Sequence, residues 1–166
     1  MGVGLVILAG AIWAFAATRP PAPPEGVVSF DVPSHAVVDG AVAYEQTPPV
    51  GGDHAAKVEN CGFYRNPIAN ENGVASMARG AVWITYKPDA NPDDINSIRQ
   101  LAVDQTYVLV SPASNLPSSI VASSWARQLQ VDSSDDERLV QFIHSFRLSS
   151  LAPESGPCAG GIGVPE

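Results

Sequence analysis

The clearest pattern of apolar and polar positions lies in the second half of the chain. Residues 80–87, GAVWITYK, are rich in β-branched and aromatic side chains and predict a strand. Apolar residues then recur at helical spacing behind a good N-cap, Asn91, and predict a helix over residues 92–104. A short apolar strand over residues 106–111 follows. A crossover of this length makes the two strands parallel and their connection right-handed.

The chain after residue 119 predicts an extended segment and a second helix. Residues 120–131 are expected to be extended, as one long strand or as a bulged pair. Residues 135–147 have an apolar helical face and follow a capping box made by Ser134 and Glu137, so we expect a helix there. The resulting order, β-α-β-β-α, predicts an α/β (α+β) fold with a mixed sheet and helices packed on it.

The first half of the folded part is rich in turns. Between Val27 and Gly80 the motifs VPS, VDG, TPPVGG, RNP and ANENG interrupt the apolar pattern. Short strands are expected only over residues 27–32 and 37–44, and the rest is expected to be ordered loop. A chain of 166 residues, 45% of them hydrophobic, can form one domain with its own core, which we place at residues 27–166.

The start of the chain is apolar and uncharged over residues 1–18, which as a helix would reach roughly 27 Å. We favour a transmembrane anchor over a cleaved signal peptide, for which AFA at residues 14–16 would suit, and over a buried soluble helix. Residues 19–26, RPPAPPEG, predict a semi-rigid proline-rich spacer. No basic residue precedes the apolar stretch and Arg19 follows it, so we expect a natural start further upstream with a basic tail. Residues 27–166 would then be extracytoplasmic, held at the cell membrane.

The overall charge and the motif content exclude several classes of function. The formal net charge is −8 with only nine lysines and arginines, which argues against binding of nucleic acid. The chain has no GxSxG, P-loop, GxGxxG, HExxH or CxxC motif. The missing CxxC argues against a thiol oxidoreductase. We therefore expect no catalytic activity and no cofactor.

The two cysteines, Cys61 and Cys158, lie in loops far apart in the chain. In a domain outside the cytoplasm they should be oxidised to a disulfide, and closing so long a loop would stabilise the fold by roughly 4–5 kcal/mol. Two free thiols are the alternative if the domain is cytosolic. We expect the disulfide.

Among the three histidines, His54 is the candidate for chemistry because it follows GGD in a loop, with Asp53 and Glu59 nearby. A lone histidine is nevertheless more often structural. We expect His144 to pack at the edge of an apolar helix face and His35 to be solvated.

Several stretches of the chain resemble a bacterial family known as domain of unknown function 3105. They are TPPVGGDH, NCGFY, Pro67, NENGV and RGAVWITYKP, and further on YVLVSP, VASSWARQLQVDS and the PC.GG pattern. The resemblance covers about residues 26–163. It implies a short basic cytoplasmic tail, one membrane helix and an exported domain.

The same resemblance implies that a site has degenerated here. Family members carry a histidine-rich stretch similar to VHSLEHGAV, which together with the histidine matched by His54 looks like a metal or catalytic site. This chain has VASMARGAV, in which Ala75 and Arg79 stand at the histidine positions and Ala78 at the glutamate position. Val37 stands where the family tends to have another histidine. Arginine cannot ligate a metal, so His54, Ala75, Ala78 and Arg79 are expected to be the remnant of a site.

We therefore expect a membrane-anchored, extracytoplasmic accessory or interaction domain without catalytic activity, and a candidate subunit of a membrane protein complex. The alternative is an extracytoplasmic protein that binds copper or zinc through His54, with Asp53 as a second ligand.

Overall fold

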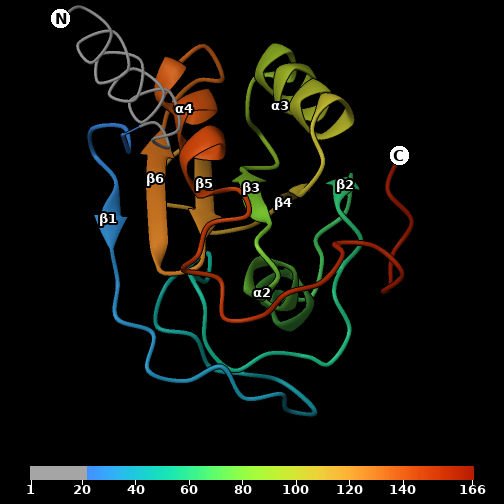
Figure 1. Cartoon of the computed structure of the whole chain (residues 1–166). Helices are drawn as coiled ribbons and strands as arrows, with labels where there is room; N and C mark the ends of the chain where they lie inside the picture. The colour runs from blue at the N-terminus through green and yellow to red at the C-terminus, as the bar shows by residue number, and fades with distance from the viewer. Residues whose placement is uncertain (1–21) are drawn as a thin grey trace, which may run out of the picture.

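The computed structural model describes residues 22–166. Within this part the chain forms a six-stranded mixed sheet in the order β1-β6-β5-β3-β4-β2, with three helices (Figure 1). The elements are β1 Val28–Ser29, β2 Gly62–Phe63, α2 Asn70–Ala78, β3 Val82–Tyr86, α3 Pro92–Asp104, β4 Val108–Pro112, β5 Ile120–Ser124, β6 Arg127–Val131 and α4 Glu137–Phe146. The expected membrane anchor and the first residues of the spacer lie outside the described residues. In residues 22–166 no helix is long and apolar enough to span a bilayer.

The centre of the sheet confirms the predicted crossover. β3 and β4 are parallel, with Val82 opposite Val108 and Tyr86 opposite Pro112, and α3 connects them. The bounds of α3 agree with the expected helix. Its N-cap is Asn91, whose side chain accepts a hydrogen bond from the backbone N–H of Asp93 at 2.9 Å.

Residues 120–131, expected to be one long strand or a bulged pair, form two strands joined by a tight turn. β5 and β6 are antiparallel, with Ser124 opposite Arg127, so the chain reverses at Trp125 and Ala126. Ala126 has a φ of 62°, and its N–H donates to the carbonyl of Val50 at 2.7 Å. Its carbonyl accepts from the N–H of Phe30. Contacts with distant segments therefore hold a turn that lacks the usual glycine or asparagine.

The predicted second helix is present, but its cap differs. The N-cap of α4 is Asp136, whose side chain accepts from the N–H of Arg138 at 3.0 Å. The backbone N–H of Ser134 donates to Asp94 at 2.6 Å, and no capping box forms with Glu137. The prediction of Ser134 as the cap was wrong. Ser134 instead lies just before α4 and bonds to Asp94 in the first turn of α3, which links the starts of the two helices.

The first half contains less strand and more helix than expected. The strand expected over residues 37–44 is absent, and only an isolated parallel bridge joins Val37 to His54. The strand expected over residues 27–32 is reduced to β1, two residues that pair with β6. A loop was expected where α2 forms. Gly73, in the middle of this helix, has Trp83 against it, and a β-carbon at Gly73 would lie 2.6 Å from Cζ3 of the indole ring.

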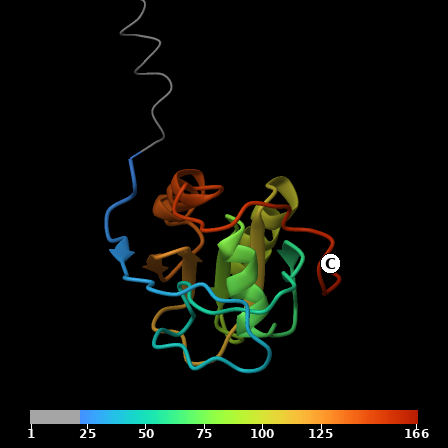
Figure 2. The same ribbon diagram turned by 60° about the horizontal axis from the view of Figure 1, so that its bottom comes forward.

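The sheet separates two different layers. On one face α3 and α4 pack against an apolar core that includes Val82, Ile84, Val110, Leu129 and Phe142. On the other face α2 packs against Trp83 and Leu109, and the chain from about residue 30 to residue 60 runs around this side (Figures 1 and 2). Both expected candidate loops, with His54 and with Cys61, belong to this second layer.

Candidate functional site around His54

The segment that carries His54 is fixed by backbone pairing. The N–H of His54 donates to the carbonyl of Ala36, and its carbonyl accepts from the N–H of Val38 at 2.9 Å. The side chain is 1% exposed, and its ring lies edge-on to Trp125 with the ring centres 6.2 Å apart. The other two histidines are exposed. This was expected for His35, whereas the packing predicted for His144 was wrong because His144 lies outside the buried face of α4, which Ile143 and Phe146 occupy on either side of it in the chain.

Both ring nitrogens of His54 face oxygen atoms. Nδ1 lies 3.0 Å from the carbonyl oxygen of Gly52, and Nε2 lies 3.1 Å from Oε1 of Glu154. A carbonyl oxygen only accepts, so Nδ1 carries a hydrogen. Nε2 is within hydrogen-bond distance of the carboxyl group of Glu154, which is 29% exposed. Both ring nitrogens of His54 are therefore in contact with oxygen atoms of the domain.

Glu154 links His54 to the end of α2. Its backbone N–H donates to the carbonyl of Ala78 at 2.9 Å, and its other carboxylate oxygen lies 3.5 Å from Nε of Arg79. We call His54, Glu154 and Arg79 the His54 cluster. Glu154 was missed from the sequence because it lies 100 positions from His54, in a loop without any recognisable motif.

The residues at the histidine-rich positions of the family are placed by α2. Ala75 and Ala78 are buried on this helix, and Ala78 packs in the core with Met77 and Trp83. Arg79 is the C-cap of α2, where its positive charge lies at the negative end of the helix. The structure thus brings Ala78 and Arg79 to Glu154, and through Glu154 to His54.

Asp53 does not take part in the His54 cluster. Its carboxylate accepts hydrogen bonds from the hydroxyl of Ser34 and from the N–H of Ala36, the latter at 2.9 Å. These bonds, above all the one from Ser34, lower the pKa of Asp53. In the part of the chain that the structure describes, no group of three or more histidine, cysteine, aspartate or glutamate side chains could hold a metal ion.

Glu59 is buried beside the C-terminal strap, the name we give to residues 152–166. Burial raises the pKa of Glu59, and a hydrogen bond with the Tyr64 side chain opposes this shift in part. The pKa of Tyr64 is raised as well, by burial and by the neighbouring Glu59. The backbone of the strap lies directly against these two side chains at Gly163. No larger residue fits there, because a β-carbon would lie 1.8 Å from Oε1 of Glu59. Glu59 therefore packs against the strap and is not part of the His54 cluster.

The disulfide between Cys61 and Cys158 is present, as predicted, and joins residues 97 positions apart with their Cα atoms 5.4 Å from each other. Backbone bonds continue from it along the strap. The N–H of Cys61 donates to the carbonyl of Cys158, and the N–H of Glu166 donates to Phe63 in β2. The strap therefore covers the β2 edge of the sheet and ends beside it (Figure 1).

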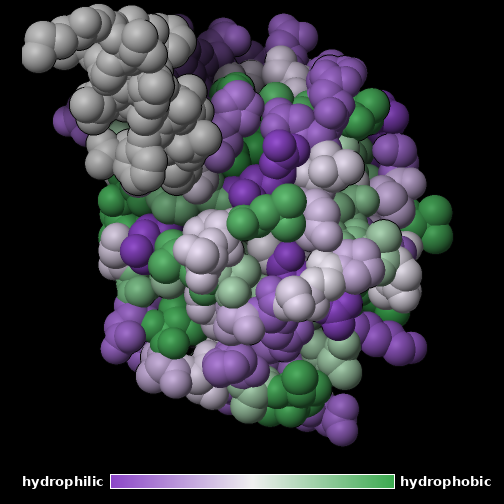
Figure 3. Space-filling view, viewed as in Figure 1, coloured by the Kyte–Doolittle hydropathy of each residue, from purple (hydrophilic) through white to green (hydrophobic). Residues whose placement is uncertain are grey.

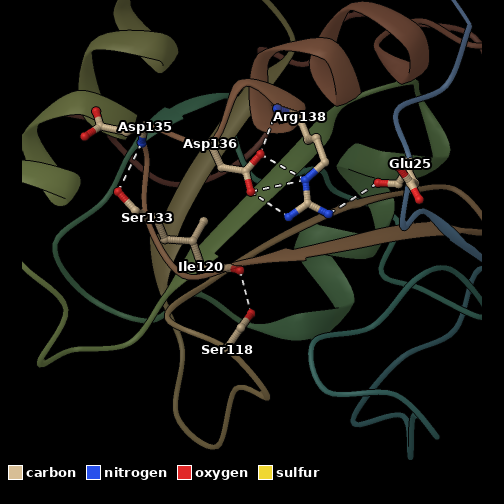
Figure 4. Close-up of polar contacts among 7 residues, drawn as sticks. All are labelled: Glu25, Ser118, Ile120, Ser133, Asp135, Asp136 and Arg138. Carbon is tan, nitrogen blue, oxygen red and sulfur yellow. Dashed lines mark hydrogen bonds and ion pairs between the residues drawn. The ribbon is translucent and has the colours of Figure 1, made fainter.

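A second polar group of side chains lies where α4 begins (Figure 4). Nη2 of Arg138 lies 2.6 Å from Asp136, and Nη1 donates to the carbonyl of Glu25 at 3.4 Å. The hydrogen bonds from Arg138 lower the pKa of Asp136. A hollow of about 480 Å³ lies beside these side chains. Because Arg138 is bonded to Asp136 and to the described end of the spacer, this group has a structural role.

The surface viewed in Figure 3 mixes hydrophilic and hydrophobic residues without one dominant apolar area. The fold and the cluster define the class of protein as a disulfide-tied mixed α+β domain with a buried histidine–carboxylate pair. The family model described as Protein of unknown function (DUF3105) matches residues 35–160, so the chain belongs to this family, as its resemblance predicted. No curated protein and no solved structure matches the chain.

Proposed function

We propose that this protein is a non-catalytic interaction domain on the outer side of the cell membrane, anchored by residues 1–18. The observation that carries the proposal is the state of His54. Its two ring nitrogens are occupied by Gly52 and Glu154. The imidazole can act as a metal ligand or a general base only if one of these bonds breaks.

Two further features support the proposal. The disulfide between Cys61 and Cys158 suits an oxidising compartment outside the cytoplasm. The uncharged residues 1–18 are long enough to span a thin bilayer core, and the proline-rich residues 19–26 would hold the domain away from it.

Carbonate extraction of native membranes tests the anchor. The full chain should stay in the membrane fraction, and a protease added to intact spheroplasts should digest residues 27–166. Release into the soluble fraction, or protection from the protease, would overturn this part of the proposal.

Quantitative affinity purification from detergent-solubilised membranes tests the interaction. The control carries residues 1–26 fused to an unrelated folded domain, so that the anchor and spacer stay the same. A membrane protein should co-purify in near-stoichiometric amount with the full chain and not with the control. Equal recovery with both proteins would show that residues 27–166 are not an interaction domain.

Calorimetric titration with copper and zinc separates this proposal from a metal-binding function. The purified full chain should show no binding at micromolar affinity. His144→Ala, at an exposed histidine, is the control for adventitious binding. Stoichiometric binding that His54→Ala abolishes and His144→Ala preserves would favour the metal-binding alternative.

A further inference from the structure

A hollow of about 200 Å³ lies beside Arg79, where the ends of α2 and α4 meet the C-terminal strap. Its lining includes Gly80 after α2, Leu148 after α4, Tyr107 before β4, and Glu154 and Gly156 in the strap. This volume is several times the roughly 30 Å³ that one water molecule occupies in the liquid. The hollow is therefore large enough for a small organic group.

Arg79 places a positive charge on the lining of this hollow. Glu154, also on the lining, is shared between His54 and Arg79. Glu154 lies closer to His54, at 3.1 Å, than to Arg79, at 3.5 Å. The contact of Arg79 with Glu154 is therefore the longer of the two, and Arg79 is the only cationic side chain among the described residues that line the hollow.

Arg79 also has hydrogen-bond donors to offer. Its side chain is 27% exposed, and within residues 22–166 its Nη1 and Nη2 atoms make no hydrogen bond. A guanidinium group with both terminal nitrogens available can bind a carboxylate through two parallel hydrogen bonds. The backbone N–H groups of Ser155 and Gly156, also on the lining, donate to no other residue of the described chain.

The walls of the hollow are held in place before any ligand binds. Tyr107 and Leu148 have φ values of 58° and 56°, a region that residues other than glycine seldom adopt. The hydroxyl of Tyr107 donates to the carbonyl of Gly156 at 3.0 Å, and the N–H of Leu148 donates to Gly80 at 2.8 Å. Strained residues that are fixed in this way are common where a protein clamps a ligand.

We propose that this hollow binds a single carboxylate group, paired with the guanidinium of Arg79. The carboxylate can belong to a free small acid or to the end of a partner polypeptide, since both present the same two oxygens. The proposal stands on the hollow and its charge alone, so it holds whether or not the chain is anchored in a membrane.

Titration of the ¹⁵N-labelled full chain in micelles, followed by NMR, tests the proposal. Sodium acetate should cause saturable shifts of the Nε–H signal of Arg79 and of the amide of Gly156, while sodium chloride at equal ionic strength should not. Equal effects of the two salts, or shifts that do not saturate, would overturn the proposal.

Two variants make this test specific. Arg79→Gln should lower the affinity for acetate at least tenfold, whereas Arg147→Gln, which removes a nearby arginine that donates to Thr106, should leave it within twofold. Dispersed spectra of both variants show that they are folded. Unchanged binding by a folded Arg79→Gln variant would overturn the proposal.

Short peptides with a free or an amidated C-terminus then identify the source of the carboxylate. Tighter binding of the free-acid peptide than of acetate, lost on amidation, would support the end of a partner chain. Binding of acetate without binding of either peptide would support a free small acid.

Discussion

The two faces of the sheet are stabilised in different ways. The face covered by α3 and α4 packs apolar side chains against apolar side chains, such as Ile98 and Phe142 against the strands. The face covered by α2 and the loops buries a row of polar side chains as well. They are Thr85, Ser111, Ser123 and Gln128.

Each polar side chain in this row has a specific partner. Ser111 accepts from the indole N–H of Trp83 at 3.0 Å, and Gln128 donates to Ser123 and to the carbonyl of Pro48. The disulfide and the His54 cluster tie the same face to the C-terminal strap. The face covered by α3 and α4 is therefore stabilised mainly by buried apolar area. The face covered by α2 depends as well on directed contacts, by which we mean hydrogen bonds and the disulfide between distant segments. Few other side chains could replace the partners in these contacts.

Phe142→Ala should have the largest effect and tests the apolar face. Phe142 is fully buried on α4, with its ring 4.7 Å from that of Phe146. Its loss should lower the free energy of unfolding by about 3–5 kcal/mol, because a cavity is left in the core. Urea denaturation measures the change. Val103→Ala, at a 63% exposed position on α3, is the control and should change stability by less than about 0.5 kcal/mol.

Replacing both cysteines tests the face held by directed contacts. Cys61→Ala with Cys158→Ala should lower the free energy of unfolding by about 2–4 kcal/mol. Hydrogen exchange should become faster for the backbone around residues 58–64 while α3 stays protected. Equal loss of protection in α3 would show that the two faces are not independent.

Gly73→Ala tests whether α2 is shaped by its neighbour. In an open helix this change would stabilise by about 1 kcal/mol. Here the new methyl group would lie 2.6 Å from the buried ring of Trp83, and such overpacking costs typically 1–3 kcal/mol. We expect a net loss of about 1 kcal/mol, measured by thermal unfolding.

The control for this change is Asn70→Ala, at the exposed first residue of the same helix, which should alter stability by less than about 0.5 kcal/mol. A stabilised Gly73→Ala variant would mean that Trp83 can move aside and that the fit between α2 and β3 is loose.

Glu59→Gln should have the smallest effect and one that depends on pH. Because burial raises the pKa of Glu59 above its ordinary value of 4.5, the folded protein loses stability relative to the unfolded chain as the pH rises from 4.5 through the folded pKa. The variant lacks this loss. It should match the wild type in acid and unfold at a higher temperature at neutral pH, as measured by calorimetry over the pH range.

Asp94→Asn provides the opposite case. Hydrogen bonds from Ser134 and Ser133 lower the pKa of Asp94 below 3.8. Its contribution is therefore present at neutral pH and disappears as the pH falls through the folded pKa. Asp94→Asn should be less stable than the wild type at neutral pH and equal to it in strong acid. If both variants gained stability at neutral pH, or both lost it, the opposite pKa shifts of Glu59 and Asp94 would be contradicted.

Most features that were predicted correctly follow from short stretches of neighbouring residues. The helix over residues 92–104 follows from a proline at its first position, an N-cap at Asn91 and apolar residues at helical spacing, all within one short stretch. The parallel pairing of β3 and β4 follows from the length of that crossover. The disulfide was predictable because only two cysteines are present.

The features that could not be predicted from the sequence depend on residues far away in the chain. Gly73 and the NENG stretch suggest a turn, yet α2 forms there, and its Gly73 leaves the space that the ring of Trp83 occupies. The turn at Ala126 depends on bonds to Val50 and Phe30.

The sequence by itself determined the family, the apolar face of the sheet and the pair of cysteines, since periodicity, capping and composition act over a few neighbouring residues or over the chain as a whole. Tertiary structure alone decided the partner of His54, the contact of Arg79 with Glu154 and the hollow beside it. These depend on Glu154, a loop residue 100 positions away, and a hydrogen bond between such distant residues leaves no periodic pattern in the chain.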